Sequence, residues 1–265
     1  MREGRRHEVP FLTAVLTMAY RQLKSFLRIR TRIVMSMGRP LIWLFFFGLG
    51  WSSALRGPAA QGALGGMSFM EFVVPGVAMM SVFFPAFFAG SSVIWDREFG
   101  FLKEMLVAPA SRKAVILGRV LGDSIIAILQ GMITLAIAMP LMGQVNPWGL
   151  PMALLAMFLT AIAYASLGTA IGSLVNNLET FQLVHMTLAM PMMFLSGAVV
   201  PLFNAPAWML TASLLVPLTY GVDLARSAIS GVGIMPPWLD LAALSCLALG
   251  LLLLAVKAFE RARPF

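Results

Sequence analysis

Few side chains in this sequence are of the types that catalysis or metal binding requires. The chain has two histidines, His7 and His185, and one cysteine, Cys246. A two-histidine metal site needs a carboxylate partner at a suitable spacing, and neither histidine has one. Serines and threonines are plentiful, but none stands in a pattern with a paired base. The sequence therefore predicts no metal site and no catalytic residue, which makes an intramembrane enzyme the weakest functional class.

The sequence also lacks the glycine-rich loop that cradles nucleotide phosphates. No GxxxxGK[ST] pattern occurs, and no glycine is followed by lysine. The chain is therefore not expected to bind ATP through a P-loop, and we expect no cofactor on it. Cys246 cannot form a disulfide within the chain, and it lies in an apolar run, where a buried or lipid-facing thiol is expected.

The composition excludes a water-soluble protein. Of the 265 residues, 60% are hydrophobic and only 11% are charged, with a mean hydropathy of +0.88. Six apolar runs predict membrane-spanning helices, at residues 33–55, 72–94, 114–142, 148–175, 181–202 and 239–256. A further run, 207–218, would make about 18 Å of helix, too short for a core of ~30 Å. We expect it to be re-entrant or interfacial.

The basic residues indicate the topology. Of the 19 lysines and arginines, 17 fall before or just inside the first span, in the loop at 95–119, or in the C-terminal tail. Arg56 and Arg226 are the two on the opposite side. The positive-inside rule then predicts that both termini are cytoplasmic. Because this topology accounts for the net charge of +8, nucleic-acid binding is not expected.

Residues 9–32 predict an amphipathic helix on the membrane surface. A signal peptide is excluded because Arg21-Gln22-Leu23-Lys24 follows the apolar stretch, where a cleavage site would need small residues. One side of the helical wheel carries Leu16, Ala19, Tyr20, Leu23, Phe26 and Leu27, and another carries Arg21, Lys24, Arg28 and Arg32. A plain positive-inside flank explains the basic residues equally well. We take 1–32 as a cytoplasmic N-terminus and 33–265 as one membrane domain.

The loop at 95–119 combines charge with large apolar side chains. It opens with Asp96, Arg97 and Glu98, contains the helix-stopping Pro109, and ends in basic residues. An ordinary positive-inside loop is one interpretation. Such a loop has no need of Phe99, Phe101, Leu102, Met105 and Leu106 close to water, and such a density of apolar groups usually seats against something. We therefore favour a short helix that docks on a soluble partner.

Prolines and glycines mark two further features. Pro201, Pro206 and Pro217 interrupt helices at membrane depth, where non-helical backbone must be buried or line a wet cavity, so this region should cap a path. Gly168 and Gly172 form a GxxxG pattern that serves either packing within the chain or dimerisation. Asp223 and Arg226, three residues apart, could pair with each other or with lipid headgroups, and we favour a local pair.

Two stretches resemble the ABC-2 type permeases, the membrane subunits of ATP-binding cassette exporters. In the first, the acidic, glycine, leucine, proline, serine-arginine and glycine pattern falls on Glu98, Gly100, Leu106, Pro109, Ser111, Arg112 and Gly118. The second is residues 194–226, with Phe194-Leu195-Ser196-Gly197, Pro201, Pro206, Trp208, Pro217-Leu218-Thr219-Tyr220, Asp223 and Arg226. This stretch is most similar to the branch of daunorubicin-resistance and nodulation-factor export permeases. The polysaccharide and O-antigen exporters are next, and Phe101 departs from the small polar residue of many members.

The resemblance implies a permease dimer, a homodimer by expectation, that works with two ATPase subunits holding ATP and magnesium. The implied ATPase-coupling loop comprises Glu98, Phe99, Gly100, Phe101, Leu102, Met105, Leu106, Pro109 and Arg112. The expected translocation path and outer gate comprise Trp43, Phe46, Met193, Phe194, Pro201, Pro217 and Tyr220. The expected protein is an all-α, six-span permease of the bacterial inner membrane, in contact with lipid, that exports an amphiphilic drug, lipid or lipid-linked glycan. A membrane scaffold without transport is the alternative from another class.

Overall fold

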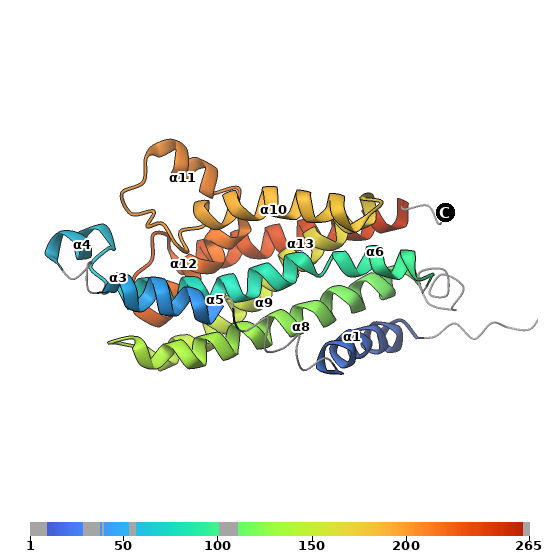
Figure 1. The fold of residues 1–265 in the computed structure, drawn as a ribbon, viewed down its shortest axis with the longest axis horizontal. Coiled ribbons are helices and arrows are strands. Elements are labelled where there is room, and N and C mark those ends of the chain that lie inside the picture. The colour runs from blue at the N-terminus through green and yellow to red at the C-terminus, as the bar shows by residue number, and fades with distance from the viewer. Residues whose placement is uncertain (1–9, 29–37, 39, 53–56, 101–110, 262–265) are drawn as a thin grey trace, which may run out of the picture.

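The long helices of the chain run side by side in an elongated bundle (Figure 1). The computed structural model describes residues 10–28, 38, 40–52, 57–100 and 111–261, and within these ranges the regular elements are helices, with no strand. Two short helices, α4 (Pro58–Ala63) and α11 (Ala207–Ser213), lie toward one end of the bundle, and α1 (Phe11–Arg28) lies toward the other. We call these the α4 end and the α1 end.

Within the part of the chain that the structure describes, four helical stretches are long and apolar enough to cross a membrane. They are Phe69–Glu98, which contains α5 (Phe69–Phe88) and α6 (Ser91–Glu98); Arg112–Leu141, which contains α8 (Arg112–Ala138); Pro147–Leu174, which contains α9 (Leu150–Leu174); and α13 (Pro237–Arg261). These stretches confirm an all-α integral membrane protein. By length and composition the described residues hold four spans, or five if a bent pair of helices counts as one, so six spans stays a prediction.

The first and fifth predicted spans are not among the four stretches found in the described residues. Of residues 33–55, the described part is an apolar helix at Pro40–Ser52 that includes a π-helical segment, η1 (Leu44–Leu49). The fifth helix, α10 (Leu178–Leu195), ends before the predicted limit of 202. It ends there because the chain turns at Gly197, whose φ of 75° favours glycine. At about 27 Å, α10 is close to the thickness of the hydrocarbon core.

The short run after α10 and the helix that follows it, which we call the re-entrant helix, take the course expected of a re-entrant segment, one of the two arrangements that a bent pair of helices allows. Helices α11 and α12 (Pro217–Ser230) are bent by 95° at their junction. The backbone N–H of Leu218 donates to the hydroxyl of Tyr164, halfway along α9, at 3.2 Å. At the other end of α12, the carbonyl of Ile229 accepts from Asn146 at 2.9 Å, at the α4 end. The α10–α11 connection also lies at the α4 end, where Phe203 lies against Gly65. The pair α11 and α12 therefore enters the bundle and leaves it at the same end. The predicted run ended at residue 218, whereas α12 continues to Ser230.

Helix α9 lies at the centre of the packing, in contact with α5, α8, α12 and α13. Its GxxxG pattern faces the junction of α5 and α6 in the same chain. A Cβ placed on Gly168 would lie 2.1 Å from the carbonyl oxygen of Phe87, and one on Gly172 would lie 2.3 Å from that of Gly90. The glycines therefore allow backbone to touch backbone, which favours packing within the chain over dimerisation as their role.

Candidate functional site

The predicted docking loop lies between two helices at the α1 end. Helix α6 ends at Glu98, and Gly100 then adopts a left-handed φ of 77° that turns the chain. Glu98 is exposed, and Phe99 is 74% exposed. Helix α8 begins at Arg112, also exposed, after Ser111 accepts a capping hydrogen bond from Ala114 at 3.2 Å. The remaining predicted loop residues, Phe101, Leu102, Met105, Leu106 and Pro109, lie outside the described residues.

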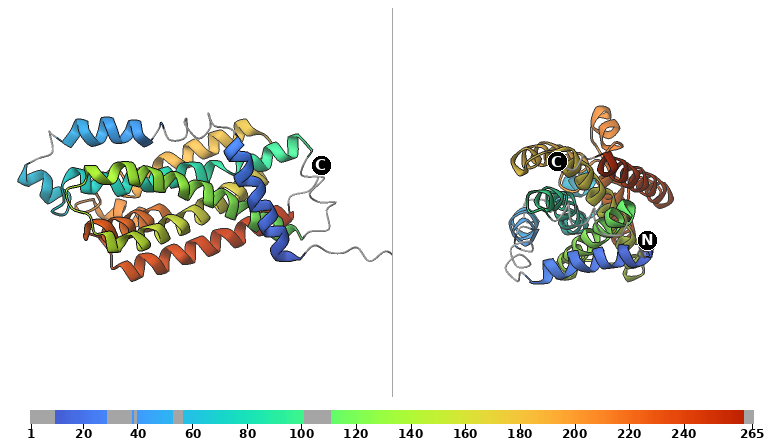
Figure 2. Two further views of the ribbon diagram at one scale, coloured as in Figure 1. Left: turned by 90° about the horizontal axis from the view of Figure 1, so that it is seen from below. Right: turned by 90° about the vertical axis from the view of Figure 1, so that its right-hand side faces the viewer.

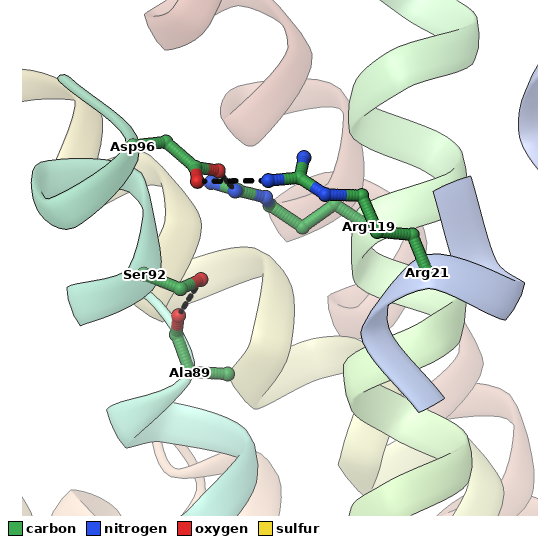
Figure 3. Close-up of polar contacts among 5 residues, drawn as sticks. All are labelled: Arg21, Ala89, Ser92, Asp96 and Arg119. Carbon is green, nitrogen blue, oxygen red and sulfur yellow. Dashed lines mark hydrogen bonds and ion pairs between the residues drawn. The ribbon is translucent and has the colours of Figure 1, made fainter. Parts of the chain in front are cut away.

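An ion network joins the two helices that flank this loop. Arg119 of α8 donates to one carboxylate oxygen of Asp96 in α6, and Arg21 of α1 donates to the other at 3.2 Å (Figure 3). The Arg119 side chain is only 4% exposed and that of Asp96 13%, whereas that of Arg21 is 42% exposed. One turn earlier, Ser92 donates to the carbonyl of Ala89 at 2.6 Å, where α5 passes into α6. Three separate helices therefore meet at one carboxylate.

The next residue of α6, Arg97, contacts a fourth helix, α9. Arg97 donates to the carbonyl oxygens of Ser173 and Val175, both at 3.1 Å, at the C-terminus of α9. Carbonyls in the last turn of a helix have no partner within the helix, and a cation there is stabilised by the helix dipole. In the sequence, Asp96, Arg97 and Arg119 stand out only as charges of the loop at 95–119. No sequence signal pairs residues that are 23 or more positions apart, so these contacts were not predicted.

Helix α1 lies across the long axis of the bundle (Figure 2). Ala14, Val15, Ala19 and Phe26 are buried, and the helix packs on α8. The approach is close because a Cβ on Gly118 would lie 2.4 Å from the carbonyl oxygen of Val15. The predicted apolar side of α1 is therefore divided into a covered part, with Ala19 and Phe26, and an exposed part. The exposed part consists of Leu16, Tyr20 and Leu27.

At the other end of the bundle, buried charges hold backbone groups around the re-entrant helix. Arg226 is 1% exposed and donates to the carbonyl of Gly197 at 2.8 Å and to that of Phe72 at 3.3 Å. Its guanidinium also lies 4.2 Å from the centre of the Phe72 ring. Asp223 accepts from the backbone N–H of Ile234 and Met235. The expected Asp223–Arg226 pair is wrong as a contact, because each side chain holds backbone instead.

The predicted path residues differ in their exposure. Met193, Pro217 and Tyr220 are buried, and Phe46 and Phe194 are exposed. A hollow of about 380 Å³ lies at the start of α5, and its lining includes none of the predicted residues. Tyr220 donates its hydroxyl to the carbonyl of Leu214 at 2.8 Å, a contact within the re-entrant pair. The other two predicted path residues, Trp43 and Pro201, are partly exposed. Among the described residues of the single chain, the predicted path residues do not line one common cavity, so the path stays a prediction.

Comparison with known proteins gives one family. Residues 13–230 match the family model described as ABC-2 type transporter. A putative transport permease, ycf38 of Cyanophora paradoxa, is 27% identical over 208 residues, which are 77% of this chain and 70% of that protein. Nodulation protein J of Rhizobium leguminosarum bv. trifolii is 28% identical over 197 residues, 74% of this chain and 72% of that protein. The inner membrane transport permease YadH of Escherichia coli K12 is 28% identical over 177 residues, 66% and 68% of the two chains.

Proposed function

The chain belongs to the ABC-2 type transporter family as a transmembrane permease subunit, and we propose that its transporter is an exporter of amphiphilic compounds. In this proposal a drug, lipid or lipid-linked glycan moves outward through a homodimer of the chain. Two ATPase subunits, which hold the ATP and magnesium, dock at the α1 end on the cytoplasmic side. The excess of basic residues in the segments at this end supports that orientation in a bacterial inner membrane.

One observation carries the proposal: a single helical stretch joins the predicted docking loop to the re-entrant helix. Phe69–Glu98 begins at the α4 end and ends directly before the loop. At its α4 end, the carbonyl of Phe72 accepts from Arg226, and the carbonyl of Glu71 accepts from Ser230 at 3.2 Å. Both donors belong to α12. A push on the loop would therefore act on the re-entrant helix through this stretch.

The contacts of this stretch suit a lever. Part way along its length, at Gly90, the backbone of this stretch lies in direct contact with the backbone of α9. The re-entrant helix that it holds begins at membrane depth, where only backbone that is buried or lines a wet cavity is tolerated. Closure of the ATPases would displace the loop, tilt α6 and α5 about the Gly90 contact, and shift α12 at the opposite end. Hydrolysis itself takes place on the partner chains.

The test removes the predicted docking contacts without touching the bundle. A Glu98→Arg, Leu102→Ala, Met105→Ala variant is expected to lose ATPase co-purification. Each central apolar anchor contributes about 1–2 kcal/mol to docking. The arginine at position 98 would also be repelled by the basic group of the ATPase that Glu98 is expected to contact. A Trp208→Ala, Leu215→Ala variant is the matched control, since both side chains are large, apolar and exposed in or beside α11. Permease abundance in the membrane is measured for both.

The outcomes separate the exporter from a scaffold. Loss of ATPase binding in the loop variant alone, at normal abundance, supports the proposal. Normal ATPase binding in the fully inserted loop variant would show that residues 98–105 are only a connection between helices. If the wild-type permease binds the ATPase normally but the bound ATPase hydrolyses ATP at the same rate as the free ATPase, in membranes or in nanodiscs, the result would favour a scaffold without transport.

A further inference from the structure

Two buried aspartates meet toward the α4 end, where the re-entrant helix passes into the last span. Asp223 lies on α12 and is 2% exposed, and Asp240 lies in the first turn of α13 and is 0% exposed. Their side chains are hydrogen-bonded to each other. The turn between the helices folds over Asp223, which accepts from the backbone N–H of Ile234 at 2.9 Å and from that of Met235 at 2.8 Å. The two carboxyl groups therefore share one buried site.

Hydrogen bonding distinguishes the two carboxyl groups. Among the described residues, no N–H or O–H group of another side chain or of the backbone donates to either oxygen of Asp240. Asp223 receives two N–H groups, and Arg226, three residues further along α12, attracts its charge without touching it. N–H donors and a nearby cation stabilise an ionised carboxylate, whereas burial without a donor disfavours one. The negative charge is therefore expected on Asp223 and the neutral acid on Asp240.

A proton explains why two acceptors face each other in this site. Two ionised carboxylates have no donor between them, and their repulsion is strong where water is excluded. One shared proton makes Asp240 a donor and leaves Asp223 the acceptor. The positive end of α13 attracts an ionised Asp240, but a helix end acts more weakly than a full charge in direct contact. The protonated form of Asp240 therefore fits the observed contact.

We propose that Asp240 is a proton-binding site and that its proton fastens the re-entrant helix to the last span. With the proton present, Asp240 donates to Asp223 and joins α13 to α12, which run together toward the α4 end (Figure 1). When the proton leaves for water, Asp240 becomes a second anion against Asp223, and the repulsion drives the two helices apart. The position of α12 then depends on pH, and this device lies far from the predicted docking loop at the α1 end.

The other ionisable groups around α12 do not provide a second source of this response. Among the described residues, those on the helices packed around α12 are Tyr164 of α9, Glu71 of α5, Glu179 and His185 of α10, Tyr220 and Arg226 of α12, and Cys246, Lys257, Glu260 and Arg261 of α13. Of these, Tyr220 interacts with the charge of Asp240, and Arg226 with that of Asp223. Tyr164 and Glu71 accept from backbone N–H groups, and His185 lies against rings of α5. Cys246 is exposed, and the others belong to helix ends at the α1 end.

The first experiment looks for the proton in the full-length permease in nanodiscs. Infrared spectra are recorded from mildly acidic to alkaline pH, in H2O and in D2O, for the wild type and for Asp240→Asn. We expect a carbonyl band of a protonated carboxyl that shifts in D2O, disappears as the pH rises, and is missing in Asp240→Asn. Glu71→Gln is the matched control, because it removes a carboxylate at the same end that receives N–H donors, and it should keep the band. The lack of any band that depends on Asp240 would overturn the proton site.

The second experiment measures whether the proton holds the helices together. In a Cys246→Ser background, spin labels are attached at Leu215→Cys beside α12 and at Leu249→Cys on α13, both exposed. The wild-type distance should lengthen as the pH rises, because the fastening is complete while Asp240 is protonated and is lost as it ionises. Asp240→Asn, whose amide donates but cannot ionise, should keep the low-pH distance throughout, and Asp240→Ser takes its place if the amide variant does not accumulate. A constant wild-type distance, or the same lengthening in these variants, would overturn the inference.

Discussion

Replacing Gly168 by alanine tests the close contact between α9 and the α5–α6 junction. The added Cβ would lie 2.1 Å from the carbonyl oxygen of Phe87, whereas real Cβ contacts essentially never fall below 3.0 Å. The backbones must therefore separate by about 0.9 Å. The obstructing atom belongs to the backbone, so no change of rotamer relieves the overlap.

The expected magnitude follows from the cost of overpacking a close-packed interior. Such insertions cost about 1–3 kcal/mol, and this one lies at the upper end because the partner is rigid. Gly250→Ala in α13 is the matched control, since nothing lies within 4 Å of its added Cβ. That control should be neutral or more stable by up to about 1 kcal/mol, because alanine favours a helix more than glycine does.

The assay is reversible unfolding in mixed micelles of mild detergent and SDS, followed by tryptophan fluorescence. Gly168→Ala should lower the free energy of unfolding by about 2–3 kcal/mol relative to Gly250→Ala. Gly172→Ala, which meets the carbonyl of Gly90, should behave similarly. The double variant should cost less than the sum, because one separation of the helices relieves both overlaps. Equal stability of Gly168→Ala and Gly250→Ala would refute the backbone contact.

Three further predictions concern the re-entrant helix and the topology. Tyr164→Phe removes the hydroxyl that accepts from the first turn of α12, and should lower the free energy of unfolding by about 1–3 kcal/mol in the same assay. Asp223→Asn replaces one of the two oxygens that accept backbone N–H groups and should cost about as much; an unchanged unfolding curve would contradict the observed contacts. Cysteines at Asn204 and Gly231 should react with an impermeant reagent from one side of the membrane and one at Arg112 from the other, whereas opposite labelling of the first two would mean that α11 and α12 cross it.

The sequence was sufficient for features that depend on one segment and its solvent. Long apolar runs predict helices in a bilayer because each span must satisfy its own backbone hydrogen bonds. The second, third, fourth and last predicted spans correspond to the four stretches that the structure describes. Local caps act in the same way: Ser68 and Glu71 form a reciprocal capping box three residues apart at the start of α5. The resemblance to ABC-2 permeases also lies in contiguous motifs, and the family match confirms it.

Contacts between distant segments were decided only by the tertiary structure. Asp96 and Arg119 read as loop charges because helix periodicity does not reveal which side chains meet across a bundle. Asp223 and Arg226 have a spacing typical of a local pair, but in the folded chain each side chain bonds to the backbone of another segment. The GxxxG pattern indicates close approach without identifying the partner, which proved to be the backbone of Phe87 and Gly90 in the same chain. Hydrophobicity and spacing determine which segments enter the membrane, whereas the packing of one helix on another determines where each buried polar group finds its partner.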